Sequence, residues 1–253
     1  MTEAMDAEFD TVAEWTAQVA RDLGPDYFVP AGCRGSGNPA ALDWLVDRLE
    51  LTPGESLLDS GAGVGGPAGY AVSRVPVSPV LVEPQIGACR AARSMFDYPA
   101  IQAVADALPF SDNAFDGAWC LGVLCTTDAQ QQVLTELRRV VRAPGRIGLL
   151  VFVATTDLPD DQQPDGNNFP TEKSLQQMLD TAGLRVDARI NTTDLPPIPQ
   201  QWQDRVEAVD DALERRFGGE EAWQIAERQS GRMGELLGDG RVSGVVLSLR
   251  RTS

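Results

Sequence analysis

The chain has 253 residues, 43% of them hydrophobic, and its 37 Asp and Glu outnumber its 21 Lys and Arg to give a formal net charge of −16. That length supports one sizeable hydrophobic core, and the apolar content is that of a globular chain rather than a disordered one. An acidic surface repels phosphate backbones and anionic lipid, so we expect no nucleic-acid partner and no membrane partner.

No apolar run reaches about 18 residues, the length that a membrane-spanning helix needs, and the acidic first residues lack a signal-peptide pattern. The sequence therefore predicts a cytoplasmic protein. It has no histidine, and its four cysteines fit no zinc-ribbon spacing: Cys33, Cys89, Cys120 and Cys125. We expect buried, reduced thiols, no metal site and no mechanism that uses a histidine base.

The first fifty residues predict a helical cap. Apolar residues at helical spacing indicate a helix over residues 9–23, which ends at Gly24-Pro25. A loop with aromatic and cationic side chains follows over residues 27–37 and contains Arg34. A second helix is predicted over residues 38–49, with an asparagine cap and a proline at its first turn.

From residue 51 onward, predicted strands and helices alternate, which is typical of a doubly wound α/β fold with a mostly parallel sheet. The predicted strands are 56–59, 80–83, 101–104, 115–121, 148–154, 184–190 and 242–249. The predicted helices are 67–75, 86–96, 127–142 and 171–183, with two more over 199–237. The polar connection over residues 155–170 is long for such a fold, a feature of mobile or ligand-covering loops.

We therefore predict one domain over residues 1–253, built on a seven-stranded sheet. Its parts are an N-terminal helical cap (1–50), a cofactor-binding core (51–190), a helical insertion (191–240) and the last strand (241–253). In such sheets ligands bind beyond the carboxyl ends of the strands, where the strand order reverses.

The first predicted strand leads into Asp59 and a turn with glycine at positions 61, 63, 65 and 66. Backbone N–H groups at the start of a helix bind carboxylates and phosphates, and Asp59 adds a negative charge beside them. That pair suits a ligand with a carboxylate and an ammonium group, whereas it repels a pyrophosphate. Glu83 ends the next strand, where a carboxylate can accept hydrogen bonds from ribose hydroxyls.

Glycine spacing alone leaves the cofactor class open, because Gly61-x-Gly63-x-x-Gly66 also fits the dinucleotide fingerprint. Asp106 follows the third strand, and its carboxylate can accept a hydrogen bond from the exocyclic amine of adenine. Ala107 can offer a backbone donor to the same ring. Together with Asp59 and the fifty residues before the first strand, these features favour an adenosyl cofactor.

In this combination the chain resembles the class I S-adenosylmethionine-dependent methyltransferases, in the broad group that includes the ubiquinone and menaquinone methyltransferases. The resemblance covers about residues 50–190. It rests on five motifs in order: Asp59-x-Gly61-x-Gly63-x-Gly65, Glu83, Asp106-Ala107-Leu108-Pro109-Phe110, Phe115-Asp116 and Pro144-Gly145-Arg146. It implies a Rossmann-like methyltransferase fold, S-adenosylmethionine as cofactor, and methyl transfer to an O, N or C atom of a small-molecule metabolite or natural product.

The resemblance also implies roles for individual residues. Asp59, Gly61, Gly63 and Gly65 surround the methionine part, Glu83 binds the ribose, Pro84 lies against adenine, Asp106 and Ala107 meet the adenine edge, and Leu121 walls the pocket. Arg34 reaches the cofactor carboxylate or faces solvent. Many relatives carry a histidine after the fourth strand, where this chain has Leu124-Cys125-Thr126, so no catalytic residue is assigned.

Two alternatives stay open: an NAD(P)-dependent oxidoreductase, and a cofactor-binding protein without transfer activity. We expect the methyl acceptor under the loop at 27–34, the loop at 155–170 and the helices at 199–237. Trp202 and Phe217 fit the buried stripes of those helices better than a substrate cage. The sequence makes no prediction of oligomeric state.

Overall fold

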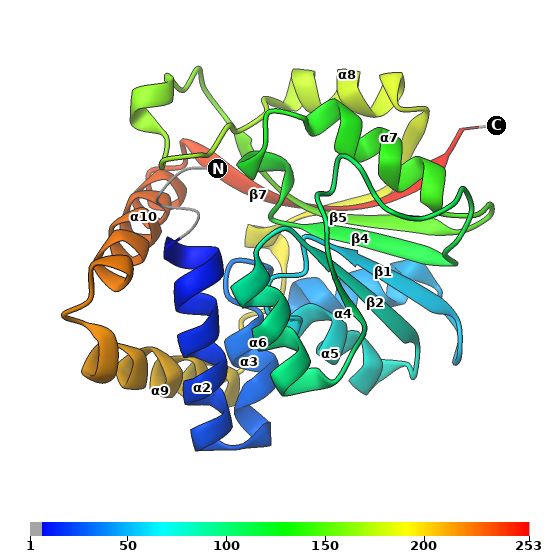
Figure 1. Cartoon of the computed structure of the whole chain (residues 1–253). Coiled ribbons are helices and arrows are strands. Elements are labelled where there is room, and N and C mark those ends of the chain that lie inside the picture. Colours follow the sequence, from blue (N-terminus) through cyan, green and yellow to red (C-terminus); the bar gives the residue numbers. More distant parts are fainter. Residues whose placement is uncertain (1–6, 253) are drawn as a thin grey trace.

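The computed structural model describes residues 7–252, which form a seven-stranded sheet between layers of helices (Figure 1). The strands are β1 (Ser56–Ser60), β2 (Ser78–Glu83), β3 (Ala100–Gln102), β4 (Gly117–Leu121), β5 (Arg146–Ala154), β6 (Leu184–Asn191) and β7 (Val242–Arg251). Their order across the sheet is β3-β2-β1-β4-β5-β7-β6, and β7 alone runs antiparallel to both of its neighbours. The predicted fold class, a doubly wound and mostly parallel seven-stranded sheet, is confirmed.

Helices cover both faces of the sheet, as its doubly wound order requires (Figure 1). One face carries α4 (Pro39–Leu49), α5 (Gly66–Arg74) and α6 (Ile86–Phe96), and the other carries α7 (Gln130–Val140) and α8 (Glu172–Thr181). Short turns of helix occur at η3 (Leu124–Thr126), η4 (Asp160–Gln162) and η5 (Thr192–Asp194). The sheet order reverses between β1 and β4, so the crevice for a ligand is expected beyond the carboxyl ends of these strands.

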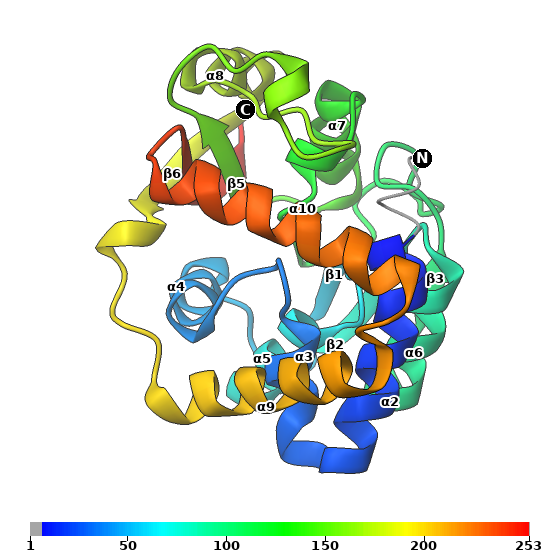
Figure 2. The same ribbon diagram turned by 90° about the vertical axis from the view of Figure 1, so that its left-hand side faces the viewer.

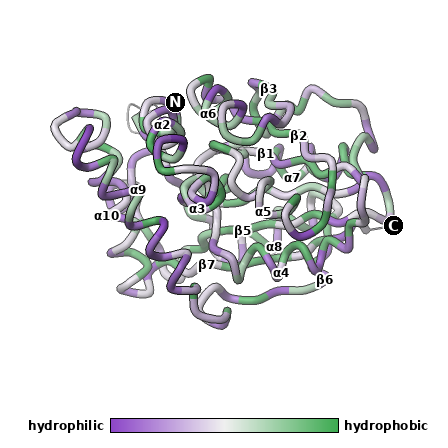
Figure 3. Tube along the Cα trace, turned by 90° about the horizontal axis from the view of Figure 1, so that it is seen from below, coloured by the Kyte–Doolittle hydropathy of each residue, from purple (hydrophilic) through white to green (hydrophobic). Residues whose placement is uncertain are grey.

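The N-terminal helices and the helical insertion pack on each other rather than standing apart. They are η1 (Ala7–Val12), α2 (Ala13–Leu23), η2 (Pro25–Tyr27), α3 (Phe28–Gly32), α9 (Gln200–Phe217) and α10 (Glu221–Gly238). In Figure 2, α9 and α10 lie across one end of the molecule with α2 and α3 beside α9. Figure 3 shows hydrophilic residues recurring along α9 and α10, so these helices bury one face only.

Aromatic side chains of the insertion belong to this packing. Trp15 stacks on Phe217 with ring centroids 4.3 Å apart, and Trp202 meets the edge of Tyr70 at 6.1 Å. These two ring contacts confirm the prediction that Trp202 and Phe217 belong to the buried faces of their helices rather than to a substrate cage. The expected division of residues 1–253 into cap, core, insertion and last strand stays a prediction, and the shared apolar cluster of α2, α9 and α10 agrees with a single domain.

Several boundaries differ from the sequence-based expectation. β3 ends at Gln102 instead of 104, because it is a short edge strand that pairs only with β2. Asp106 therefore lies on a turn rather than at a strand end. The five-residue helix α3 occupies part of the predicted loop at 27–37, since so short a helix has no apolar period to reveal it.

All four cysteines lie within the described part of the chain and are buried and unpaired, as expected. Among residues 7–252, no helix has the length and apolar character that crossing a membrane demands.

Candidate functional site

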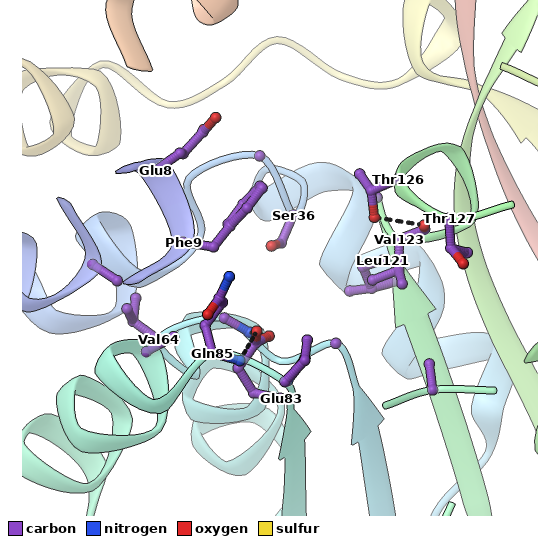
Figure 4. A pocket seen from close by; sticks show the side chains of 18 of the residues that line it. Glu8, Phe9, Ser36, Val64, Glu83, Gln85, Leu121, Val123, Thr126 and Thr127 are labelled. Atoms are coloured by element: carbon purple, nitrogen blue, oxygen red, sulfur yellow. Dashed lines mark hydrogen bonds between the residues drawn. The ribbon is translucent and has the colours of Figure 1, made fainter. Parts of the chain in front are cut away.

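A cavity of about 670 Å³ lies beyond the carboxyl ends of β1, β2 and β4. Its walls come from the glycine turn, the end of β2, the turn after β3 and the segment after β4, and η1 and α2 contribute a further side. Figure 4 shows Glu83 and Gln85 facing Phe9 across this space, with Leu121 and Thr126 at a third side. Cavities of about 300–1,000 Å³ hold cofactors and small substrates.

Seven of the ten residues predicted for the cofactor line this cavity: Gly61, Gly63, Glu83, Pro84, Asp106, Leu121 and Arg34. Sequence positions more than eighty residues apart are thus brought to one crevice by the parallel sheet. The other three, Asp59, Gly65 and Ala107, lie outside its lining.

The glycine turn faces the cavity with its backbone, in a conformation that favours glycine. Gly61 and Gly63 have φ angles of 76° and 53°, in the left-handed region that favours glycine. A Cβ on Gly61 would lie 2.2 Å from a Val123 methyl, whereas a Cβ on Gly63 would meet nothing within 4 Å. Gly61 therefore serves close packing, and Gly63 leaves room for a ligand against bare backbone.

Gly65 and Gly66 have a different task from the one expected. Gly65 caps α5 at φ 86° and donates its N–H to the Ala62 carbonyl oxygen at 2.9 Å. A Cβ on Gly66 would lie 2.1 Å from the carbonyl carbon of Gly32. The start of α5 and the end of α3 thus touch backbone to backbone, which fixes the cap beside the cavity.

Glu83 is the most tightly positioned carboxylate of the cavity and only 6% exposed. Its Oε2 accepts the Gly63 N–H at 2.9 Å and its Oε1 accepts the Gln85 N–H at 3.1 Å. Burial raises its pKa to about 6, although the two backbone hydrogen bonds favour the charged form. Each carboxylate oxygen keeps a further lone pair for a ligand hydroxyl.

Asp59 lies buried outside the cavity lining, at 1% exposure. Burial raises its pKa to about 7, with the Trp119 indole favouring and the Glu83 carboxylate opposing its charged form. The Trp119 N–H makes no hydrogen bond of good geometry, and Asp59 Oδ2 has no hydrogen-bond partner in the described structure. Asp59 is therefore a buried carboxyl group whose charge depends on pH near neutrality.

The turn after β3 brings Asp106 to the cavity wall, whereas the backbone N–H of Ala107 makes a hydrogen bond within the turn. The Ala107 N–H donates to the Val104 carbonyl oxygen at 3.2 Å, so this geometry does not favour its expected contact with an adenine ring. Val104 is 45% exposed and lines the cavity, as Pro84 does, and the sequence interpretation missed it. Its position within a predicted strand concealed it, because strand valines are usually buried.

Arg34 lines the cavity, but its guanidinium is engaged by the helical insertion. Its Nη2 donates to Glu227 Oε1 at 3.0 Å, its Nη1 lies 3.6 Å from Asp210 Oδ1, and it stacks over Trp223 at 5.3 Å. These contacts correspond to neither expected position, on the cofactor carboxylate or in solvent. They join the loop before α4 to α9 and α10.

The N-terminal segment also supplies cavity residues: Phe9, Val12 and Ala13, which the sequence analysis assigned to the apolar face of a helix, and Glu8 and Thr16, which it did not single out. The segment is fixed to α6, because Asp10 accepts the Gly87 N–H and Glu14 pairs with Arg90. A stripe that faces a cavity and one that faces a core have the same period, so spacing alone does not separate them.

The long loop at 155–170 contributes Gly166, Asn167 and Asn168 to the lining, whereas no described residue of α9 or α10 lines the cavity. Asn168 is held in place, with its N–H on the Cys125 carbonyl oxygen at 2.7 Å and its own carbonyl oxygen accepting from Gln130 at 2.7 Å. Tyr27, at the start of the predicted loop at 27–37, is also absent from the lining.

The donor set of this site fits an adenosyl cofactor. Glu83 offers carboxylate lone pairs beside open glycine backbone, and the buried Asp59 carries an oxygen without a partner. Among the lining residues, Arg34 is the only Lys or Arg, against four acids: Glu8, Glu83, Asp106 and Asp128. An excess of negative charge opposes the pyrophosphate of a dinucleotide.

Sequence comparison finds methyltransferases. A family model described as a methyltransferase domain matches residues 58–149. Methyltransferase GfsG of Streptomyces halstedii is 25% identical over 175 residues, 65% of this chain and 63% of that protein. 24-Methylenesterol C-methyltransferase 2 of Arabidopsis thaliana is 32% identical over 179 residues, 63% of this chain and 49% of that protein. The chain thus spans less than two thirds of the length of these curated relatives.

Solved structures share the fold. The cyclopropane synthase MmaA2 from Mycobacterium tuberculosis superposes with a TM-score of 0.68 at 16% identity, over 93% of this chain and 97% of that one. The [4+2]-cyclase SpnF superposes with a TM-score of 0.65 at 20% identity, over 83% of this chain and 79% of that one. These likenesses show the doubly wound fold. The matched domain and the sequence relatives support a class I S-adenosylmethionine-dependent methyltransferase.

Proposed function

We propose that this protein transfers the methyl group of S-adenosylmethionine to an O, N or C atom of a small molecule. The observation that carries the proposal is the joint placement of Glu83 and the Gly61–Gly63 turn on one wall of a 670 Å³ cavity, with space left over. The family and the relatives support the same activity. We further propose that it acts in the cytoplasm, in keeping with its composition.

The cofactor half of the cavity is assigned by chemistry. Gly61 and Gly63 would hold the methionine part against their backbone, and Glu83 would accept hydrogen bonds from the ribose hydroxyls. Pro84 and Val104 would lie against the adenine, with Asp106 as acceptor for its amine. The cofactor supplies a methyl group on a positively charged sulfur, which leaves as a neutral thioether.

The chain's own part in the reaction is to orient and to exclude water. Phe9 and Val12 line the cavity from the N-terminal segment and are apolar, so they would keep water from the reacting atoms. The acceptor would then occupy the remaining space between Phe9, Ser36 and Asn168. Relatives include proteins described as sterol, squalene and botryococcene methyltransferases, which supports an acceptor with a largely apolar body.

A transfer assay tests this proposal. Protein is incubated with S-adenosylmethionine carrying a labelled methyl group and a panel of apolar alcohols, amines and alkenes. We expect acceptor-dependent formation of S-adenosylhomocysteine, with the label in one chemical class of product. One structural neighbour is described as a cyclase, so the fold alone does not ensure transfer. Tight S-adenosylhomocysteine binding without turnover on any acceptor would support the non-transferring alternative instead.

A further inference from the structure

The end of the cavity remote from Glu83 carries a carboxylate that the cofactor does not use. Glu8 lies on η1 and extends away from Glu83 and Gln85, as Figure 4 shows. Among residues 7–252, no hydrogen bond and no ion pair within 4.0 Å reaches its side chain. Burial raises the pKa of Glu8, because the charged form loses hydration, whereas the charge of Arg34 lowers it.

The nearby cation is already neutralised. Arg34 Nη2 donates to Glu227 at 3.0 Å and Nη1 lies 3.6 Å from Asp210, so two carboxylates from α10 and α9 share one guanidinium. The charge of Glu227 also raises the pKa of Glu8. Three carboxylates thus face one arginine, a local charge of −2 when all are ionised.

Beside these charged groups, the N-terminal segment lines the cavity mostly with apolar side chains. Phe9, Val12 and Ala13 line it from the N-terminal segment, and Val64 lies below them. Apolar walls lower the local dielectric response, so the unpaired Glu8 charge acts more strongly on a ligand than it would in water. An anionic ligand would meet both repulsion and a desolvation cost here.

Resting on the proposed function, we propose that this end of the cavity is the acceptor subsite and that it selects a small molecule with a basic nitrogen on an apolar body, the ammonium group lying beside Glu8. Carboxylate and diphosphate acceptors are disfavoured by the same charges. One structural neighbour was solved with Mg²⁺ and geranyl diphosphate. In the described part of this chain, no group of three His, Cys, Asp or Glu residues is placed to hold such an ion.

Binding of three probes of equal length tests the subsite without knowledge of the natural acceptor. n-Hexylamine, 1-hexanol and hexanoate are titrated at pH 7.5 into protein saturated with S-adenosylhomocysteine, and ligand-observed NMR gives each dissociation constant. We expect the amine to bind about tenfold tighter than hexanoate, the size of one charge-assisted contact. Glu8→Gln should remove most of that preference and leave 1-hexanol unchanged.

Glu14→Gln is the matched control, because Glu14 lies one and a half turns further along the same helical segment and pairs with Arg90 outside the cavity. It should leave all three dissociation constants unchanged, and unfolding temperatures show that both variants fold. Equal or tighter binding of hexanoate, undetectable amine binding at millimolar concentration, or an unaltered preference in Glu8→Gln would each overturn the proposal. Failure of S-adenosylhomocysteine itself to bind would instead overturn the proposed function.

Discussion

Glu83→Gln is expected to weaken S-adenosylhomocysteine binding by about 100-fold, equivalent to about 3 kcal/mol. The glutamine amide has one acceptor oxygen where Glu83 accepts two backbone N–H groups, from Gly63 and Gln85. Its NH₂ group must then face one of these donors, which displaces the glycine turn, and the charge available to the ribose hydroxyls is lost. Isothermal titration calorimetry at pH 7.5 measures the change.

The pH dependence of the same binding provides an internal check. The pKa of Glu83 is about 6 in the free protein, so the ionised form predominates at pH 7.5 and is lost as the pH falls through 6. Wild-type affinity should therefore decrease below pH 6, and Glu83→Gln should lose this decrease and keep only the smaller contribution of Asp59, whose pKa is about 7. Glu55→Gln removes a carboxylate at the opposite end of β1, where it accepts the Thr52 N–H, and should leave affinity unchanged. If Glu83→Gln binds S-adenosylhomocysteine as tightly as the wild type does, Glu83 is not part of the cofactor site.

Asp59→Asn is expected to stabilise the ligand-free protein and to weaken its cofactor binding. The pKa of Asp59 is about 7 in the folded state and near 3.8 when unfolded. As the pH rises from about 4 to 7, the unfolded state ionises first, so the wild-type free energy of unfolding decreases by this contribution. Asparagine does not ionise, so its stabilising effect should grow by about 2–3 kcal/mol between pH 5 and pH 8.

Urea unfolding at the two pH values measures that difference. Asp47→Asn, on the exposed side of α4, is the control and should change the free energy of unfolding little at either pH. The loss of negative charge beneath the glycine turn should also weaken S-adenosylhomocysteine binding about tenfold, because its ammonium group loses an attractive partner. A pH-independent effect on stability would contradict a raised pKa for Asp59, and unchanged affinity would remove it from the cofactor's surroundings.

The parallel core was predictable because its signals are local. Apolar runs that end in Asp59 and Glu83 specify strands whose carboxyl ends must meet at one edge, so their convergence followed from topology alone. Most of the cofactor wall was found in this way: the Gly61–Gly63 turn, Glu83, Pro84 and Leu121 line the cavity. Their contacts with a bound cofactor stay a prediction.

The remainder depends on contacts between distant segments, which no local pattern encodes. Arg34 forms ion pairs with Asp210 and Glu227, which lie nearly two hundred residues later in the chain. Only tertiary packing brings these partners together, so the sequence pattern did not predict them. Gly66 looked like part of an anion cradle, but its missing side chain admits the backbone of Gly32. Glu8 lay just before the helix predicted over residues 9–23, and only the packing of its segment beside the cavity revealed its surroundings.

Thermal unfolding of the wild-type protein with S-adenosylhomocysteine, with NAD or with neither tests the central claim most directly. At about 100 times its dissociation constant, a ligand of the folded state stabilises by roughly 2.7 kcal/mol, which raises the midpoint by several degrees for a chain of this size. We predict that S-adenosylhomocysteine raises the unfolding midpoint and that NAD leaves it unchanged. Stabilisation by NAD with no effect of S-adenosylhomocysteine would contradict the account.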